Sequence, residues 1–400
     1  MRLDLTLLAL TGLAVSSAAN AEAPAAIACS PEAAAAAGAA VRTALARLMA
    51  IPLYEMETSV PPPVRDLIER TKDRLRAFVQ AEMACAPPSP DPEALAAAMA
   101  ARGDAYIDRT PPDPDNPAPG RHGHYLAYQV SPVEGRPELL AVVATLGISC
   151  GTDSMLLLYQ REGGRWRELM VRRAEPYAEV KGGWGDLRFA VSPRDARGRW
   201  FVATVSVTPW CTSAWQGLPY ALARPGPTPD RPDVFLRGKE TIYLGNEEDM
   251  LLRAEPDAFE LRYVAASIDP AVHNRRHVRR YAVRGDSVRR IQPVAESVRD
   301  FVDEWVVSPW AEARHWSGPD ATLEPIHAQL HEGRYELLDE FASIRACGNG
   351  VTQVEMTAEQ GPGWYFFASG GASGPWILER VGRRAEAACA GPDRLEREPG

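Results

Sequence analysis

The stretch LLAVVATLGISCGTDSMLLLY, residues Leu139–Tyr159, decides the fold class. Two apolar runs, Leu139–Ile148 and Met155–Tyr159, flank a short turn-like segment. Short apolar runs separated by turn residues are typical of paired strands. The pattern recurs from about 125 to 293 and predicts a central antiparallel β domain. Further runs of this kind are Tyr125–Val130, Trp166–Val171, Leu187–Val191, Trp200–Val207, Phe259–Ala266 and Val278–Val283.

The turn within this stretch, Gly147-Ile-Ser149-Cys150-Gly151, matches the G-x-S-x-G pattern of hydrolase nucleophiles. That motif places serine on a sharp turn between a strand and a helix. Here the segment after the turn is itself strand-like, and Cys150 is better placed in a disulfide. We therefore do not expect Ser149 to be a catalytic nucleophile.

Three four-strand stretches can be drawn, near 125–172, 187–237 and 241–292. A sandwich, an open barrel or a small propeller-like fold all fit this spacing. The segment Ser192–Trp200 resembles the Asp-box turn of sialidase-type propellers. The resemblance covers nine residues, and the gaps between Ser192, Asp195 and Gly198 are each one residue longer than in that motif. It implies a hairpin of propeller type.

Helices are predicted on both sides of the β domain. Ser30 followed by proline is typical of a helix start, and a helix is expected from Pro31 to Ala50. Apolar residues on one face predict a second helix over 64–83, and a third follows at 92–102. After Pro293 we expect an amphipathic helix near 298–306 and two short helices. A small sheet over 337–381 ends the fold.

Together these elements predict an α+β protein with an N-terminal helical hairpin, a central antiparallel β domain, linking helices and a small C-terminal β-sheet. The predicted boundaries are a signal peptide at 1–21, a helical region at 22–109, a proline-rich linker at 110–122, the β domain at 123–293, a helical linker at 294–333, a β region at 334–390 and a disordered tail at 391–400.

The predicted signal peptide has a basic Arg2, an apolar Leu5–Val15 and a small-x-small site at Ala19–Ala21. We therefore expect a periplasmic or extracellular protein with no integral membrane segment after signal removal. The composition is ordinary for a globular chain, with 46% hydrophobic residues, 24% charged residues and a net charge of −9. The negative charge argues against nucleic acid as a partner.

All six cysteines follow the predicted cleavage site, and an even count in an exported chain indicates disulfides. If the first two helices form an antiparallel hairpin, Cys29 lies beside Cys85. Pairing of neighbours is then the simplest scheme, although sequence alone does not fix the connectivity. The other expected pairs are Cys150 with Cys211 and Cys347 with Cys389.

Two clusters are candidate ligand-binding residues. Arginines concentrate between 273 and 290, where their side chains suit phosphate, sulfate or carboxylate groups. Pairing with acids such as Glu247, Glu248 and Asp249 is the structural alternative. Aromatic residues gather around Cys211, where they suit either sugar stacking or packing of the core. The candidate residues are Arg275, Arg276, Arg279, Arg280, Arg284, Trp184, Trp210, Trp215 and Tyr220.

Four of the seven histidines form pairs four residues apart, His273 with His277 and His327 with His331, and His122 and His124 form another pair. No third ligand is decisively placed beside any of them. We therefore predict no metal and no cofactor. The sequence favours a non-catalytic, exported envelope protein that binds a glycan, an anionic ligand or a partner protein. The alternative is a secreted hydrolase acting on an envelope or extracellular polymer.

Overall fold

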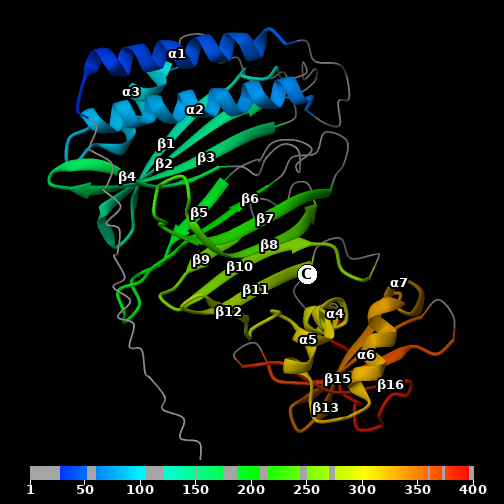
Figure 1. Ribbon diagram of the computed structural model, residues 1–400. Helices are drawn as coiled ribbons and strands as arrows, with labels where there is room; N and C mark the ends of the chain where they lie inside the picture. The colour runs from blue at the N-terminus through cyan, green and yellow to red at the C-terminus, as the bar shows by residue number, and fades with distance from the viewer. Residues whose placement is uncertain are drawn as a thin grey trace, which may run out of the picture.

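The computed structural model describes residues 28–51, 60–103, 121–148, 151–173, 187–207, 215–243, 250–269, 275–358, 361–371 and 374–395. It confirms the predicted α+β class, with helices at the N-terminus, a β-rich centre, linking helices and a small C-terminal sheet (Figure 1).

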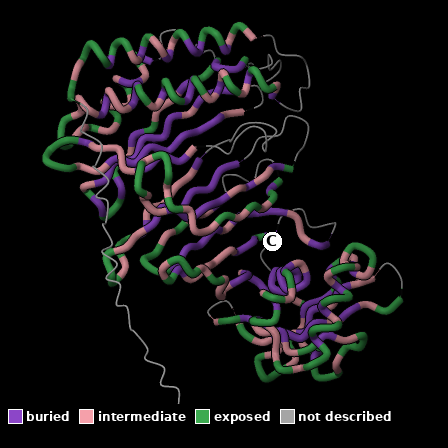
Figure 2. The backbone as a smooth tube through the Cα atoms, viewed as in Figure 1, coloured by how far each residue is buried: buried purple, intermediate pink, exposed green. Residues whose placement is uncertain are grey.

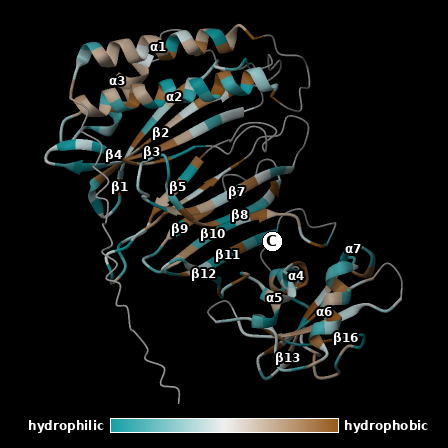
Figure 3. Ribbon diagram, viewed as in Figure 1, coloured by the Kyte–Doolittle hydropathy of each residue, from teal (hydrophilic) through white to brown (hydrophobic). Residues whose placement is uncertain are grey.

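Two long helices, α1 (Pro31–Met49) and α2 (Pro62–Cys85), pack against each other, and α3 (Pro92–Gly103) packs against α1. The side chain of Ser30 accepts a hydrogen bond from the Ala33 amide and caps α1, as its sequence predicts. Along α2 hydrophilic and hydrophobic residues alternate (Figure 3). The predicted Cys29–Cys85 disulfide is confirmed and joins the start of α1 to the end of α2.

The central region contains three four-stranded antiparallel sheets whose strands lie in sequence order. The bounds of these strands are β1 (Leu126–Val133), β2 (Arg136–Ile148), β3 (Gly151–Glu162), β4 (Arg165–Arg172), β5 (Leu187–Val191), β6 (Val202–Ser206), β7 (Trp215–Arg224), β8 (Asp233–Tyr243), β9 (Leu251–Ala254), β10 (Ala258–Ala265), β11 (Arg275–Arg284) and β12 (Ser287–Arg290). We call the sheets β1–β4, β5–β8 and β9–β12 the first, second and third sheet.

The three sheets stack face to face. One face of the first sheet packs under the helices, through side chains such as Val142 and Phe78. Its other face meets the second sheet through Leu158 and Val202, and the second meets the third through Leu218 and Phe259. Buried residues therefore run through the strands between layers (Figure 2). The described part of the central domain is therefore a stack of open four-stranded meanders, and no strand pairing within it closes the sheets into one barrel.

The hairpin between β5 and β6 contains the segment that resembles an Asp box. Asp195 accepts hydrogen bonds from the amides of Arg197 and Arg199, at 2.8 and 2.9 Å. Ser192 accepts one from the Phe201 amide at 2.9 Å, and Gly198 has a φ of +75°. The acidic and hydroxyl side chains hold the turn and contact no other element through these bonds.

A C-terminal unit follows the third sheet. Its helices are α4 (Val298–Val307), α5 (Trp310–Ala313), a 3-10 turn (Arg314–Trp316), α6 (Leu323–Glu332) and α7 (Arg334–Leu337). Its sheet consists of β13 (Phe341–Gly348), β14 (Val351–Met356), β15 (Trp364–Ser369) and β16 (Ile377–Gly382). Helices α4 and α6 share one apolar core with this sheet, and the predicted Cys347–Cys389 disulfide is confirmed.

The C-terminal boundary differs from its prediction. Residues 391–395 belong to the segment expected to be disordered, yet they bond to β13. The Ile344 amide donates to Asp393, the Arg394 amide donates to the Ile344 carbonyl, and Leu395 packs on the core. The charged composition of this segment predicts disorder, but Leu395 is apolar and packs on the core. Strand β13 lies at the edge of its sheet, so its backbone groups are available to bond with residues 393 and 394. Residues 396–400 lie outside the described residues, as do Cys150 and Cys211.

Candidate functional site

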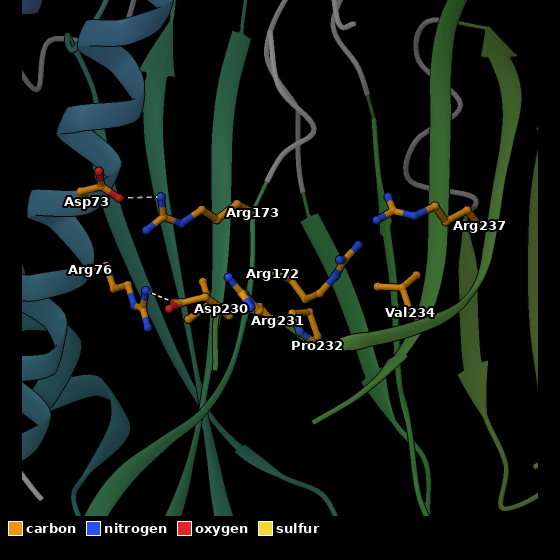
Figure 4. A pocket seen from close by; sticks show the side chains of 10 residues that line it. Asp73, Arg76, Arg172, Arg173, Asp230, Arg231, Pro232, Val234 and Arg237 are labelled. Atoms are coloured by element: carbon orange, nitrogen blue, oxygen red, sulfur yellow. Dashed lines mark hydrogen bonds and ion pairs between the residues drawn. The ribbon is translucent and has the colours of Figure 1, made fainter. Parts of the chain in front are cut away.

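A cavity of about 550 Å³ lies where α2 and the first sheet meet the second sheet. We call it the arginine cavity because five of the ten residues that line it are arginines. Figure 4 shows their side chains on helix α2, at the end of β4, in the loop before β8 and on β8, with Arg173 directed at Asp73 and Arg76 at Asp230. The lining residues are Asp73, Arg76, Val171, Arg172, Arg173, Asp230, Arg231, Pro232, Val234 and Arg237.

Helix α2 fixes one wall of the cavity through Arg76. Its guanidinium forms a bidentate pair with Glu168 on β4, with Nε 3.1 Å from both carboxylate oxygens and Nη2 2.5 Å from Oε2. It also pairs with Asp230 across the cavity (Figure 4). Burial disfavours the charge, but Glu168 and Asp230 outweigh it and raise the pKa of Arg76.

The second sheet supplies the opposite wall. The loop between β7 and β8 is tied to the first sheet by a hydrogen bond of 2.9 Å from the Val171 amide to the Pro229 carbonyl. This bond brings Arg231 beside the end of β4. Arg173, the residue after β4, pairs with Asp73 at 2.7 Å, and Arg237 projects from β8 (Figure 4).

The cavity has more arginines than carboxylates, although Arg76 pairs with both Glu168 and Asp230 and Arg173 pairs with Asp73. Five arginines line it against two aspartates, whereas the whole chain has a net charge of −9. Both aspartates are more than half exposed, at 58% for Asp230 and 63% for Asp73. Converging guanidinium groups present planar, paired donors that match phosphate, sulfate and carboxylate oxygens. The arrangement is therefore suited to holding an anion with several charged groups.

The arginines predicted as an anion site lie on β11 and largely contact carboxylates. Arg275 is buried and pairs with Asp303 and Glu304 on α4. Arg279 pairs with Glu304 as well, and its Nε lies 2.7 Å from Glu240 on β8. These guanidiniums are engaged inside the fold, while Arg284 is exposed. The remaining pairs are Arg280 with Glu255 and Glu260, and Arg276 with Glu296. The acids considered from sequence, residues 247–249, lie outside the described residues.

The aromatic candidates do not gather at one described surface. Tyr220 is buried, and its hydroxyl lies 2.9 Å from that of Tyr281. Trp215 is 38% exposed and packs edge-on against Tyr243, with ring centroids 5.1 Å apart. Trp184 and Trp210 lie outside the described residues. The exposed pair on β7 and β8 offers one aromatic platform.

The paired histidines on α6 form hydrogen bonds with backbone carbonyls at the C-terminal end of α4. His327 Nε2 lies 3.0 Å from the Trp305 carbonyl and 3.1 Å from that of Ser308, and His331 Nδ1 lies 2.8 Å from the Val306 carbonyl. Each histidine thus donates to carbonyls at the end of a helix, which lack partners within it. Among the described residues, no three histidines, cysteines or carboxylates gather as a metal site.

No local sequence pattern predicts the arginine cavity, because its residues come from positions 73 to 237. The available signal was an adjacent pair, Arg172-Arg173, directly after an apolar run. Comparison with protein-family models and with curated proteins finds no match. In the described part of the chain, no helix has the length and apolar character to cross a membrane.

Proposed function

We propose that the protein is a non-catalytic, exported binding protein of the bacterial envelope that holds an anionic ligand in the arginine cavity. The observation that carries the proposal is the convergence of five arginines on a cavity of about 550 Å³. Small-molecule sites are generally about 300–1,000 Å³. A molecule with two or more phosphate, sulfate or carboxylate groups, such as a short acidic oligosaccharide, suits this size and charge.

Two further observations support parts of this proposal. The disulfides Cys29–Cys85 and Cys347–Cys389 suit an oxidising compartment, as the predicted signal peptide does. The carboxylates that line the cavity, Asp73 and Asp230, are each paired with an arginine. A hydrolase needs a carboxylate with a proton to transfer or a nucleophile with its base, so this pairing favours binding over catalysis.

The test removes two exposed arginines at the second-sheet wall. In the Arg231→Gln/Arg237→Gln variant we expect affinity for anionic probes to fall by about tenfold, because two charge-assisted hydrogen bonds are lost. Isothermal titration with pyrophosphate, citrate and trigalacturonic acid measures this change. These residues are exposed, so the melting temperature should stay unchanged.

A matched control separates the cavity from overall charge. The Arg253→Gln/Arg384→Gln variant removes the same charge from exposed positions on β9 and after β16. Its affinities should equal those of the unmodified protein. If both double variants lose affinity equally, or if no probe binds saturably, the arginine cavity is not a ligand site.

The Trp215→Ala variant tests the aromatic platform on β7 and β8. If trigalacturonic acid loses affinity in this variant and in none of the arginine variants, the glycan binds at the aromatic platform.

A further inference from the structure

A second cavity, of about 280 Å³, lies in the groove between α1 and α2. Each helix contributes residues at the spacing i, i+3, i+4 and i+7, which puts four side chains on one face of each helix. Small residues on α1 leave the space open, and both faces end in arginine. The residues that line this interhelical groove are Ala40, Thr43, Ala44, Arg47, Leu67, Arg70, Thr71 and Arg74.

The groove concentrates positive charge. Arg47, Arg70 and Arg74 are exposed, and within the described residues no carboxylate lies within ion-pair distance of any of them. Arg70 and Arg74 are one turn apart on α2, where like charges destabilise a helix. The acids nearest in sequence have other partners, since Glu69 pairs with Lys72 and Asp73 with Arg173.

Both threonine hydroxyl groups in the groove donate hydrogen bonds to backbone carbonyls of their own helix. Thr43 donates to the Ala39 carbonyl at 2.9 Å, and Thr71 donates to the Leu67 carbonyl at 2.8 Å. The arginines are therefore the polar groups left to recognise a ligand. Three guanidiniums around an alanine-lined space favour a tetrahedral oxyanion over a neutral sugar, because a sugar hydroxyl also needs acceptors.

From this geometry we propose that the interhelical groove binds a phosphate or sulfate ester group. It is a second site, separate from the arginine cavity, because Arg70 and Arg74 lie on the flank of α2 opposite to Arg76. Its smaller volume accommodates the charged head of a molecule. The ester can belong to a soluble metabolite or to a lipid headgroup, and the chemistry recognised is the same.

The experiment is done on the full mature chain in the Arg231→Gln/Arg237→Gln background, so that the arginine cavity contributes little. Calorimetric titration with inorganic phosphate, sulfate and glycerol 3-phosphate reports the soluble ester. Co-sedimentation with phosphatidylglycerol–phosphatidylcholine vesicles reports the lipid headgroup. Further substitution Arg70→Gln/Arg74→Gln is expected to weaken binding by about tenfold, and Arg47→Gln alone by a few fold.

The Arg47→Gln variant is the most discriminating test, because Arg47 lines the groove from α1 whereas Arg70 and Arg74 line it from α2. The control is again Arg253→Gln/Arg384→Gln, added to the same background. Weakening by both groove variants and not by the control supports the proposal, and the probe that binds identifies the source of the ester. Equal weakening by the control, or no saturable binding of any probe, overturns it. Neither result bears on the arginine cavity, which is tested without these substitutions.

Discussion

Asp300 is a buried acid whose environment opposes its charge. It lies in the first turn of α4, is 1% exposed, and its amide donates to the Ser297 side chain. Burial raises its pKa from 3.8 to about 6, although Arg275 and Arg299 favour the charged form. The native state therefore holds this proton up to about pH 6, whereas an unfolded chain releases it near 3.8. Stability contributed by the protonated form is lost as pH rises through this window.

The Asp300→Asn substitution tests this pH dependence. Asparagine has the same shape and no charge to bury, so the variant should be more stable than the parent by about 1–3 kcal/mol at pH 7.5 and nearly equal to it at pH 4. Urea unfolding at both pH values measures the difference. The control Asp66→Asn, at an exposed position of α2, should change stability little at either pH. A variant that is less stable at pH 7.5 would show that the charged form of Asp300 supports the fold.

At the scale of elements, two carboxylates of α4 contact the third sheet, Asp303 through Arg275 and Glu304 through three arginines. Glu304 is fully buried and pairs with Arg275 and Arg279 on β11 and with Arg290 on β12, the last at 2.9 Å. Burial opposes its ionisation, yet the three guanidiniums hold the pKa of Glu304 well below its ordinary value. The arginine-rich hairpin therefore has an internal counter-charge on a helix that follows it in the chain.

Replacing Glu304 with glutamine should cost about 3–5 kcal/mol, because it leaves buried guanidiniums without their shared partner. Chemical denaturation at pH 7 measures the loss. The matched control is Glu312→Gln, which removes a 37% exposed partner of Arg290 at 3.0 Å and should cost less than about 1 kcal/mol. Similar small losses in both variants would contradict the view that Glu304 fastens α4 to the sheet.

The elements differ in how far sequence predicts them. Helices α1 and α2 and the disulfide between Cys29 and Cys85 follow from local signals, namely a capped start and an apolar face. Strand β8 (DVFLRGKETIY) has no such signal, since charged residues interrupt its apolar ones and most of its side chains are not fully buried. Likewise, the sequence shows that Arg279 carries a positive charge. It does not show that Glu304, 25 residues later in the chain, lies against it.

At the scale of the whole molecule, the arginine cavity exists because three layers meet. Helix α2 supplies Arg76, the first sheet supplies Arg172 and Arg173, and the second sheet supplies Arg231 and Arg237. Sheets stacked through apolar faces bring these charges together, and the gain from burying those faces offsets the repulsion. No local pattern encodes this meeting, so the site becomes visible only when the order of the layers is known.

Asp230 links two of these layers, and under the proposed function its carboxylate would compete with the anion for Arg76. It reaches from the loop before β8 to Arg76 on α2, and 58% of its side chain is exposed. Losing an exposed ion pair costs at most about 1 kcal/mol, so Asp230→Asn should leave the fold intact. The same change removes a negative charge from the cavity and frees one edge of a guanidinium. Affinity for pyrophosphate and citrate should therefore rise by about 3- to 10-fold, and most strongly at low salt.

Calorimetric titration at 20 mM and 200 mM sodium chloride measures both the gain and its salt dependence. Asp233→Asn is the matched control, because it removes the same charge three residues away at an exposed position that does not line the cavity. A gain for Asp230→Asn that exceeds the gain for Asp233→Asn places the anion beside Arg76. Weaker binding by Asp230→Asn would instead mean that the carboxylate holds Arg76 in its binding position, and equal gains would mean that the anion responds only to overall charge.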